Sequence, residues 1–270
     1  MVSIEGQDPH ASAPIVSVPG RGWREFPYWL LAIVAAIAWM SYLIATQDRY
    51  GDAYDAIIPG LRTTVETTAY AFVIALVLGL VAGLGRISRN VITRNIALTY
   101  IEFIRGVPIL VLIFTIAFVV VPELSSAFGF SNDTITNQWR AVIALALIYG
   151  AYLAEVFRAG IESVPTGQSE AGRSLGMSHA QTMRRIVLPQ AIRNMTPAIG
   201  NDLIAMLKDS SLVSVLAVRD LTQRARLDAG TSFDFRATYL VLTLLYLVMT
   251  LVLSLLLSWY RRRLGLDDRG

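Results

Sequence analysis

The chain has 270 residues, of which 54% are hydrophobic and 16% are charged, and its formal net charge is +3. A soluble domain usually holds about a quarter charged residues, so this composition excludes an ordinary soluble protein and points to a membrane. Because the sequence has no cysteine and only two histidines, disulfides, thiol nucleophiles and multi-histidine metal sites are excluded as well. We expect no cofactor, no resident metal, no catalytic constellation and no nucleic-acid partner.

In chain order, residues 1–25 are rich in proline, glycine and small polar residues, so a disordered tail is predicted there. An apolar helix needs about 20 residues to cross the hydrocarbon core. Two runs, 141–160 and 196–218, are apolar but contain ionisable residues, which are rare and often functional inside a helix bundle. Four further runs are free of charge: 26–47, 67–85, 106–122 and 237–260. Since backbone polar groups in lipid must be satisfied within the segment, we expect an all-α integral membrane protein with about six transmembrane helices.

The second of these runs carries a ridge of small residues, Ala71, Ala75, Gly79 and Gly83, at every fourth position. Such a ridge lets another helix approach closely. Two interpretations are open, an interface with a second subunit and packing within the chain, and we favour the second.

The arginines indicate an orientation. They are about twice as numerous in the segments on one side of the spans as on the other, and basic residues favour the cytoplasmic side of bacterial membranes. We therefore predict a multi-pass protein of the bacterial inner membrane, in contact with its lipid, with both termini and the segment 161–196 in the cytoplasm.

The segment 161–196 is long for a connection between helices and contains helix signals of its own. Pro165 suits the first turn of a helix, which Gly176 is placed to end as a left-handed cap. Ser178 and Gln181 have the spacing of a capping box for a second helix, and Pro189 follows it. Physics alone leaves two interpretations equally open: a plug that docks on a partner, and a helix lying on the membrane surface.

Residues 167–191, GQSEAGRSLGMSHAQTMRRIVLPQA, strongly resemble the EAA loop of ATP-binding-cassette importer permeases, whose pattern is E-A-A, then L-G, then I-x-L-P. Four further motifs resemble permeases of the polar amino-acid uptake family: PGLRTTVETT, YIEFIRGVPIL, AYLAEVFRAGIESV and LKDSSLVSVLAVRDLT. The resemblance covers residues 57–263. Gly172 departs from it by standing where the family usually has a second alanine, and residues 26–47 add a transmembrane span before the family core.

This resemblance implies that residues 57–263 form an importer transmembrane domain. It implies three kinds of partner: cytoplasmic ATPase subunits, an extracytoplasmic amino-acid-binding protein, and a second permease that is identical or related. The loop 161–196 is then the coupling element that docks on the ATPase. The residues that the resemblance assigns to this coupling are Glu170, Ala171, Gly172, Leu175, Gly176 and Pro189.

Polar residues within the spans are candidates for a substrate path: Glu155, Lys208, Asp209, Ser210 and Ser211. Structural alternatives stand beside this interpretation. Glu102 with Arg105, and Glu155 with Arg158, have the i, i+3 spacing of ion pairs on a helix surface. For Lys208 and Asp209 we favour a structural pair that holds this span against its neighbours.

The energy source for transport must lie on another chain. Lys208 is the only lysine and Leu207 precedes it, whereas a P-loop requires Gly-Lys followed by Ser or Thr. We therefore expect a transport subunit and not an enzyme. The alternative is a stand-alone secondary amino-acid carrier, for which paired inverted repeats and discontinuous helices are typical, and the sequence shows no internal repeat.

Overall fold

The computed structural model describes residues 28–129, 131 and 134–263. The regular structure in these ranges is entirely helical, which confirms the all-α fold class. The predicted disordered tail, residues 1–25, lies outside the described residues. The chain divides into two units, Met1–Trp39 and Met40–Gly270, and the second unit contains the packed core.

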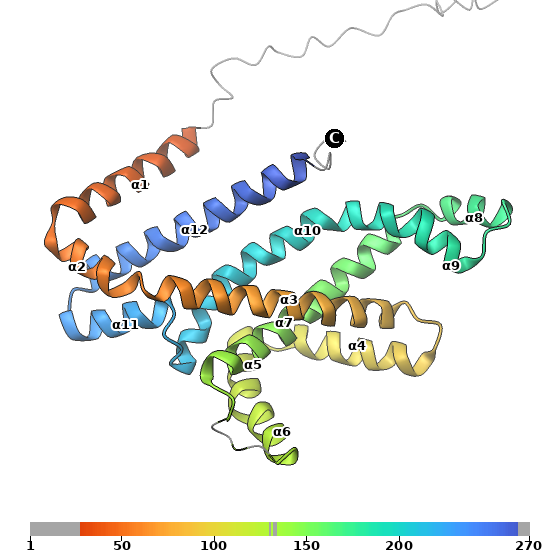
Figure 1. Ribbon diagram of the computed structural model, residues 1–270, viewed down its shortest axis with the longest axis horizontal. Helices are drawn as coiled ribbons and strands as arrows, with labels where there is room; N and C mark the ends of the chain where they lie inside the picture. Colours follow the sequence, from red (N-terminus) through yellow and green to blue (C-terminus); the bar gives the residue numbers. More distant parts are fainter. Residues whose placement is uncertain (1–27, 130, 132–133, 264–270) are drawn as a thin grey trace, which may run out of the picture. The chain divides into compact units, whose positions relative to one another are not determined.

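The helices appear in chain order in Figure 1. They are α1 (Tyr28–Thr46), α2 (Asp48–Ile57), α3 (Gly60–Arg86), α4 (Val91–Gly106), α5 (Ile109–Thr115), the π-helical η2 (Ile116–Val120), α6 (Val121–Ala127), α7 (Asn137–Glu162), α8 (Thr166–Ser174), α9 (His179–Thr182), the π-helical η4 (Met183–Val187), α10 (Leu188–Asp209), the 3-10 helix η5 (Ser210–Leu216), α11 (Leu221–Ser232) and α12 (Phe235–Arg263).

Four segments of the described chain are long and apolar enough to cross a membrane: Asp48–Arg86, Ile109–Ala127, Asn137–Glu162 and Phe235–Arg263. They contain or overlap the predicted spans 67–85, 106–122, 141–160 and 237–260. The stretch Leu30–Thr46 of α1 is also apolar but shorter, and the predicted span 26–47 begins outside the described residues.

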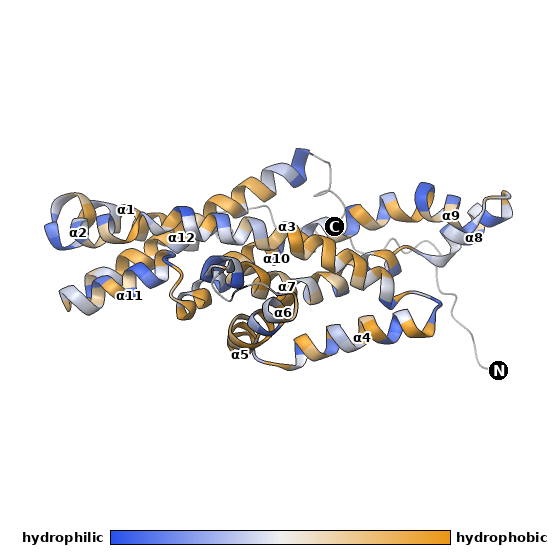
Figure 2. Cartoon of the chain, turned by 60° about the horizontal axis from the view of Figure 1, so that its bottom comes forward, coloured by the Kyte–Doolittle hydropathy of each residue, from blue (hydrophilic) through white to orange (hydrophobic). Residues whose placement is uncertain are grey.

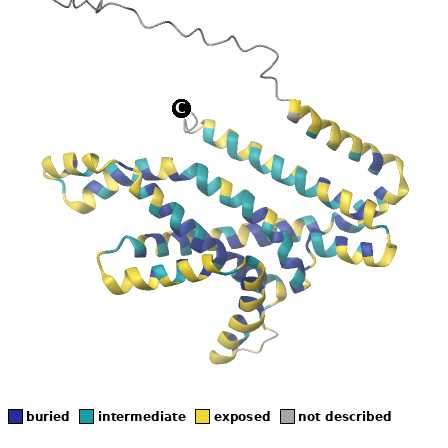
Figure 3. Cartoon of the chain, turned by 180° about the vertical axis from the view of Figure 1, so that it is seen from behind, coloured by how far each residue is buried: buried dark blue, intermediate teal, exposed yellow. Residues whose placement is uncertain are grey.

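The centre of the second unit is the interface between α3 and α7. The ridge Ala71, Ala75, Gly79 and Gly83 is buried there, which confirms packing within the chain. A Cβ atom on Gly79 would lie 2.7 Å from Cβ of Leu153, and one on Gly83 would lie 2.8 Å from the carbonyl oxygen of Ala154. The small residues therefore let the two backbones approach closely. Figure 3 shows that buried residues follow α7 along much of its length.

A second apolar cluster joins α2, α11 and α12, with Tyr50, Ile57, Leu221 and Val241 among its buried members. Gly60 fits against the backbone at the beginning of α11, where an added Cβ would lie 2.6 Å from the carbonyl carbon of Asp220. This cluster therefore fixes the first turn of α3 relative to α11.

The outer face of α12 is apolar and unburied within this chain. Val252, Leu255 and Leu256 are exposed, and Figure 2 shows hydrophobic residues along most of this helix. In a membrane protein such a surface faces lipid or another subunit.

The predicted span 196–218 is not a single helix, and it is not among the described segments that are long and apolar enough to cross a membrane. The helix begins at Leu188 and ends at Asp209, and the chain then tightens into η5. Helix α10 continues directly from α9 and η4, so Pro189 lies inside a continuous helical segment that begins within the predicted cytoplasmic segment 161–196. Proline normally breaks an α-helix because its ring clashes with the carbonyl four residues before. Here that residue, Arg185, belongs to the π-helical turn η4, which relaxes the contact.

Helix α4 is an element that the predicted spans did not include. It is amphipathic, with Ala97, Ile101 and Ile104 buried and Ile92 and Phe103 exposed. It packs on α3 and α7 and ends before Pro108, whose preceding residue has an extended backbone.

Candidate coupling surface and polar clusters

The candidate coupling surface is the hairpin formed by α8 and the α9–η4 segment, between the end of α7 and the beginning of α10. Gly172 is the contact point between its two arms. It is the buried residue of α8, and a Cβ added there would lie 2.8 Å from Cδ1 of Ile186 and 3.2 Å from Oγ1 of Thr182. Gly172 must therefore stay small for the hairpin to close on itself, which is a different reason from the predicted fit into a groove on a partner.

Hydrogen bonds fix both ends of the turn between the two arms. Gly176 has φ +81°, as predicted for a left-handed cap. Its N–H donates to the carbonyl of Arg173, and the N–H of Met177 donates to that of Gly172, which together form a Schellman motif. Ser178 and Gln181 then form the predicted capping box. The hairpin is thus a closed local structure.

The outer face of α8 makes little contact with the rest of the chain. Glu170 and Ala171 are exposed, and Leu175 is 83% exposed. Single exposed leucines are ordinary on protein surfaces. Leu175 differs because it lies in a turn that hydrogen bonds hold rigid. Pro189 is exposed too, although it belongs to α10 and not to this face.

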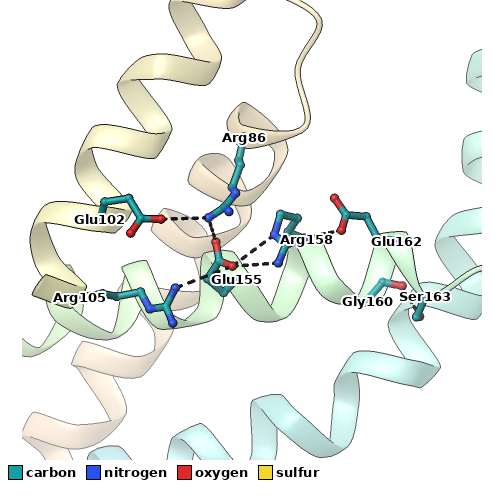
Figure 4. A network of polar contacts seen from close by, with 8 residues as sticks. All are labelled: Arg86, Glu102, Arg105, Glu155, Arg158, Gly160, Glu162 and Ser163. Carbon is teal, nitrogen blue, oxygen red and sulfur yellow. Dashed lines mark hydrogen bonds and ion pairs between the residues drawn. The ribbon is translucent and has the colours of Figure 1, made fainter.

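A second site is a cluster of charges at the ends of α3, α4 and α7, drawn in Figure 4. The carboxylate of Glu155 is its centre. One oxygen pairs with Arg86, while the other accepts from Arg158 at 3.0 Å and lies 3.9 Å from Arg105. Arg86 also lies 3.8 Å from Glu102, and Arg158 also pairs with Glu162.

This cluster ties three helices together through one carboxylate. The Glu155 side chain is only 19% exposed, whereas Glu102 is 64% exposed. The predicted Glu155–Arg158 pair is present, and Glu102 pairs with Arg86 instead of Arg105. Because both oxygens of Glu155 already face arginines, this geometry favours the structural interpretation of Glu155 over a substrate ligand. The contribution of Arg86 depends on a contact between distant segments, which spacing within one helix does not reveal.

The polar residues at the end of α10 differ in their contacts with the rest of the chain. Asp209 accepts a hydrogen bond of 2.8 Å from the hydroxyl of Tyr149 in α7. Lys208 is exposed, and in the described part of the chain it does not pair with Asp209, so the predicted Lys208–Asp209 pair is wrong. The two side chains are adjacent in an α-helix and point in different directions.

The two serines that follow begin η5. Ser210 is buried and donates to the carbonyl of Leu207 at 2.7 Å. Ser211 is partly buried. Ser210 therefore already uses its hydroxyl hydrogen within the chain, on a carbonyl of the last turn of α10.

Asp220, at the opposite end of the bundle from the hairpin, was not singled out by the sequence. It is fully buried and caps α11 by accepting from the N–H of Gln223 at 2.8 Å. Its other oxygen is buried and has no hydrogen-bond partner among the described residues. Burial raises the pKa of this carboxyl to about 6.

The chain as a whole is similar to known proteins. The family model described as "Binding-protein-dependent transport system inner membrane component" matches residues 75–266. The chain is 36% identical over 216 residues to the probable amino-acid permease protein YxeN of Bacillus subtilis, covering 79% of this chain and 93% of that protein. It is 34% identical over 212 residues to the glutamine transport system permease protein GlnP of Escherichia coli, covering 78% and 94%.

A solved structure is similar as well. The crystal structure of an amino acid ABC transporter with histidines contains a chain that is 39% identical, with a TM-score of 0.70. The match covers 82% of this chain and 98% of that one.

Proposed function

Because the chain belongs to the family of binding-protein-dependent transport system inner membrane components, we propose that it is the permease subunit of an ATP-driven amino-acid importer. The relatives that carry a transport name are amino-acid permeases, among them glutamine, arginine and L-cystine systems. The chain's own sequence lacks a P-loop, which supports an ATPase on a separate subunit.

The observation that carries the coupling role is the closed hairpin of α8 and α9–η4 with Leu175 83% exposed at its turn. A Schellman motif and a capping box hold this turn without help from a partner. The segments α9, η4 and α10 are continuous. Because the hairpin is rigid, a subunit that binds and displaces it also moves α10. Glu170, Ala171 and Leu175 supply the docking face in this proposal, while Gly172, Gly176 and Pro189 shape the hairpin and its link to α10.

Three partners complete the proposal: ATPase subunits on the cytoplasmic side, an extracytoplasmic amino-acid-binding protein, and a second permease, identical or related. The charge bias supports a cytoplasmic position for both termini and for the hairpin. The roles of Glu155, Lys208, Asp209, Ser210 and Ser211 in a substrate path stay predictions.

Reconstitution tests this function directly. The permease is placed in proteoliposomes that carry ATP inside, with and without the ATPase and the binding protein, and uptake of labelled amino acids is measured. Uptake that requires both partners and ATP is expected. Full uptake by the permease alone, driven by an ion gradient, would show a secondary carrier instead.

The orientation has its own test, because the chain has no cysteine. Ser126→Cys and Ser178→Cys place single thiols at two exposed positions on opposite sides of the predicted topology. In spheroplasts an impermeant maleimide is expected to label Ser126→Cys alone. Labelling of Ser178→Cys alone would invert the topology.

A further inference from the structure

A cavity of about 460 Å³ lies behind the coupling hairpin. The turn between α3 and α4, the end of α7, and the two arms of the hairpin form its walls. The aliphatic residues Ile87, Ile161, Val164 and Val187 line much of its apolar part. The polar lining residues are Arg89, Glu162, Thr166, Ser169, Arg173, His179 and Thr182.

The charges around this cavity are not balanced. Glu162 is the one carboxylate among the lining residues, and it pairs with Arg158. Arg89 and Arg173 form no ion pair within the described ranges, and Arg173 makes a single hydrogen bond of 3.4 Å from Nε to the carbonyl of Ser169. The terminal nitrogens of two guanidinium groups, and the imidazole of His179, are therefore available to an anion.

An unsatisfied hydroxyl lies in the same wall. Thr182 is 2% exposed, and its Oγ1 is buried without a hydrogen-bond partner among the described residues. A threonine inside a helix commonly donates to the carbonyl three or four residues before it, and Thr182 does not. A buried hydroxyl without a partner costs free energy. The Thr182 oxygen faces Gly172, 3.2 Å from the position of an added Cβ, and has almost no surface open to the cavity.

We propose that this cavity binds a phosphate group, carried either by a small cytoplasmic metabolite or by a phospholipid headgroup. Guanidinium groups bind phosphate through paired hydrogen bonds. A phosphate dianion also has three acceptor oxygens, which match the several N–H and O–H donors better than a single carboxylate does. The site rests on the cavity and not on the proposed function.

A bound phosphate has a mechanical consequence, and this step does rest on the proposed function. Arg89 belongs to the turn between α3 and α4, whereas Arg173 and His179 belong to the two arms of the hairpin. A phosphate held by all three ties the hairpin to the transmembrane bundle. Occupancy of the cavity then restricts the movement through which the hairpin transmits the action of the ATPase.

The test measures binding of inorganic phosphate to the full-length chain, purified in detergent and phosphate-free buffer, by titration calorimetry. Arg89→Gln and Arg173→Gln are each expected to weaken binding about tenfold, since each removes charge-assisted hydrogen bonds. Thr182→Val keeps the shape and removes a hydroxyl that is closed to the cavity, so it should bind like the wild type. Arg185→Gln, an exposed arginine of the same hairpin that does not line the cavity, is the matched control and should bind like the wild type.

A second arm identifies the source of the phosphate. Native mass spectrometry after addition of phosphatidylglycerol is expected to show one lipid retained by the wild type and by Arg185→Gln, but lost from Arg173→Gln, if the headgroup is the ligand. Binding of inorganic phosphate without lipid retention identifies a soluble ligand. Both results support the site.

Three results would overturn the proposal. The first is no binding of either probe. The second is equal binding by Arg173→Gln and Arg185→Gln. The third is binding that disappears when the ATPase subunits are added, which would mean that a partner side chain fills the cavity in the assembled transporter. Thermal unfolding of each variant shows whether a lost site reflects a lost fold.

Discussion

Two glycine-containing helix contacts in this molecule have different structural roles. At the interface of α3 and α7, Gly79 and Gly83 are buried and bring two long helices together at the centre of the bundle. In the hairpin, Gly172 brings α8 onto η4 in the same way, but the result is a small element whose outer face stays exposed. The first contact builds a core, and the second builds a rigid projection.

The difference shows how to separate structural from functional residues in the coupling motif. Residues on the inner face of α8, such as Gly172, are required for the hairpin to exist. Residues on its outer face, such as Leu175, do nothing for the fold within this chain. A substitution on the inner face therefore changes fold and coupling together, whereas one on the outer face isolates the coupling.

The largest loss of stability is expected at the core contact. Gly79→Leu places a side chain where even a Cβ would lie 2.7 Å from Leu153, and overpacking of this kind costs about 3 kcal/mol or more. Thermal unfolding and size-exclusion profiles in detergent measure the loss. Val77→Leu, at a position that is 60% exposed on the same helix, is the control. If Gly79→Leu unfolds at the wild-type temperature, the close contact between α3 and α7 is not present.

A loss of about 3 kcal/mol is expected for Glu155→Gln, because removing the carboxylate leaves Arg86 and Arg158 partly buried without their partner. Glu102→Gln, at a mostly exposed carboxylate, should cost about 1 kcal/mol or less. Thermal unfolding compares the two variants.

Transport by Glu155→Gln distinguishes the two interpretations of this residue. If Glu155 is structural, uptake of cationic and neutral amino acids falls by the same factor. A loss confined to the cationic substrate would return Glu155 to the substrate path.

The sequence predicted much of this organisation, and its errors have physical reasons. The small-residue ridge, the left-handed cap at Gly176 and the capping box at Ser178 depend on local spacing, and the structure confirms all three. The predicted span 196–218 is not one helix because the chain changes to the 3-10 helix η5 after Asp209, a change that the apolar pattern does not reveal. Two of the three partners of Glu155 were missed because Arg86 and Arg105 reach it from other helices.

A smaller effect is expected at Asp220, and it depends on pH. Burial raises the pKa of this carboxyl from its ordinary value of 3.8 to about 6. The folded state therefore favours the protonated form, so stability is greatest at acid pH and falls as the pH rises from about 4 to about 6. A shift of this size corresponds to roughly 2–3 kcal/mol above pH 6.

Asp220→Asn tests this, because asparagine also caps helices but does not titrate. Thermal unfolding of the wild type is expected at lower temperature at pH 7.5 than at pH 5, and the difference should shrink in Asp220→Asn. An unchanged pH dependence in the variant would show that another group is responsible.

The central claim, that the hairpin of α8 and α9–η4 docks on an ATPase, is tested most directly at Leu175. Leu175→Asp should change the stability of the isolated permease by less than about 0.5 kcal/mol, since the side chain is 83% exposed. The same change should weaken binding of the ATPase about 30-fold, the effect of losing an interface hot spot of about 2 kcal/mol. Phe128→Asp, at an exposed position on the opposite side of the predicted topology, is the control. The measurement is the affinity of purified ATPase for each permease in nanodiscs, together with ATP hydrolysis stimulated by the loaded binding protein. We expect Leu175→Asp alone to lose both ATPase affinity and stimulated hydrolysis. Wild-type values of both in Leu175→Asp would contradict docking of the hairpin on the ATPase.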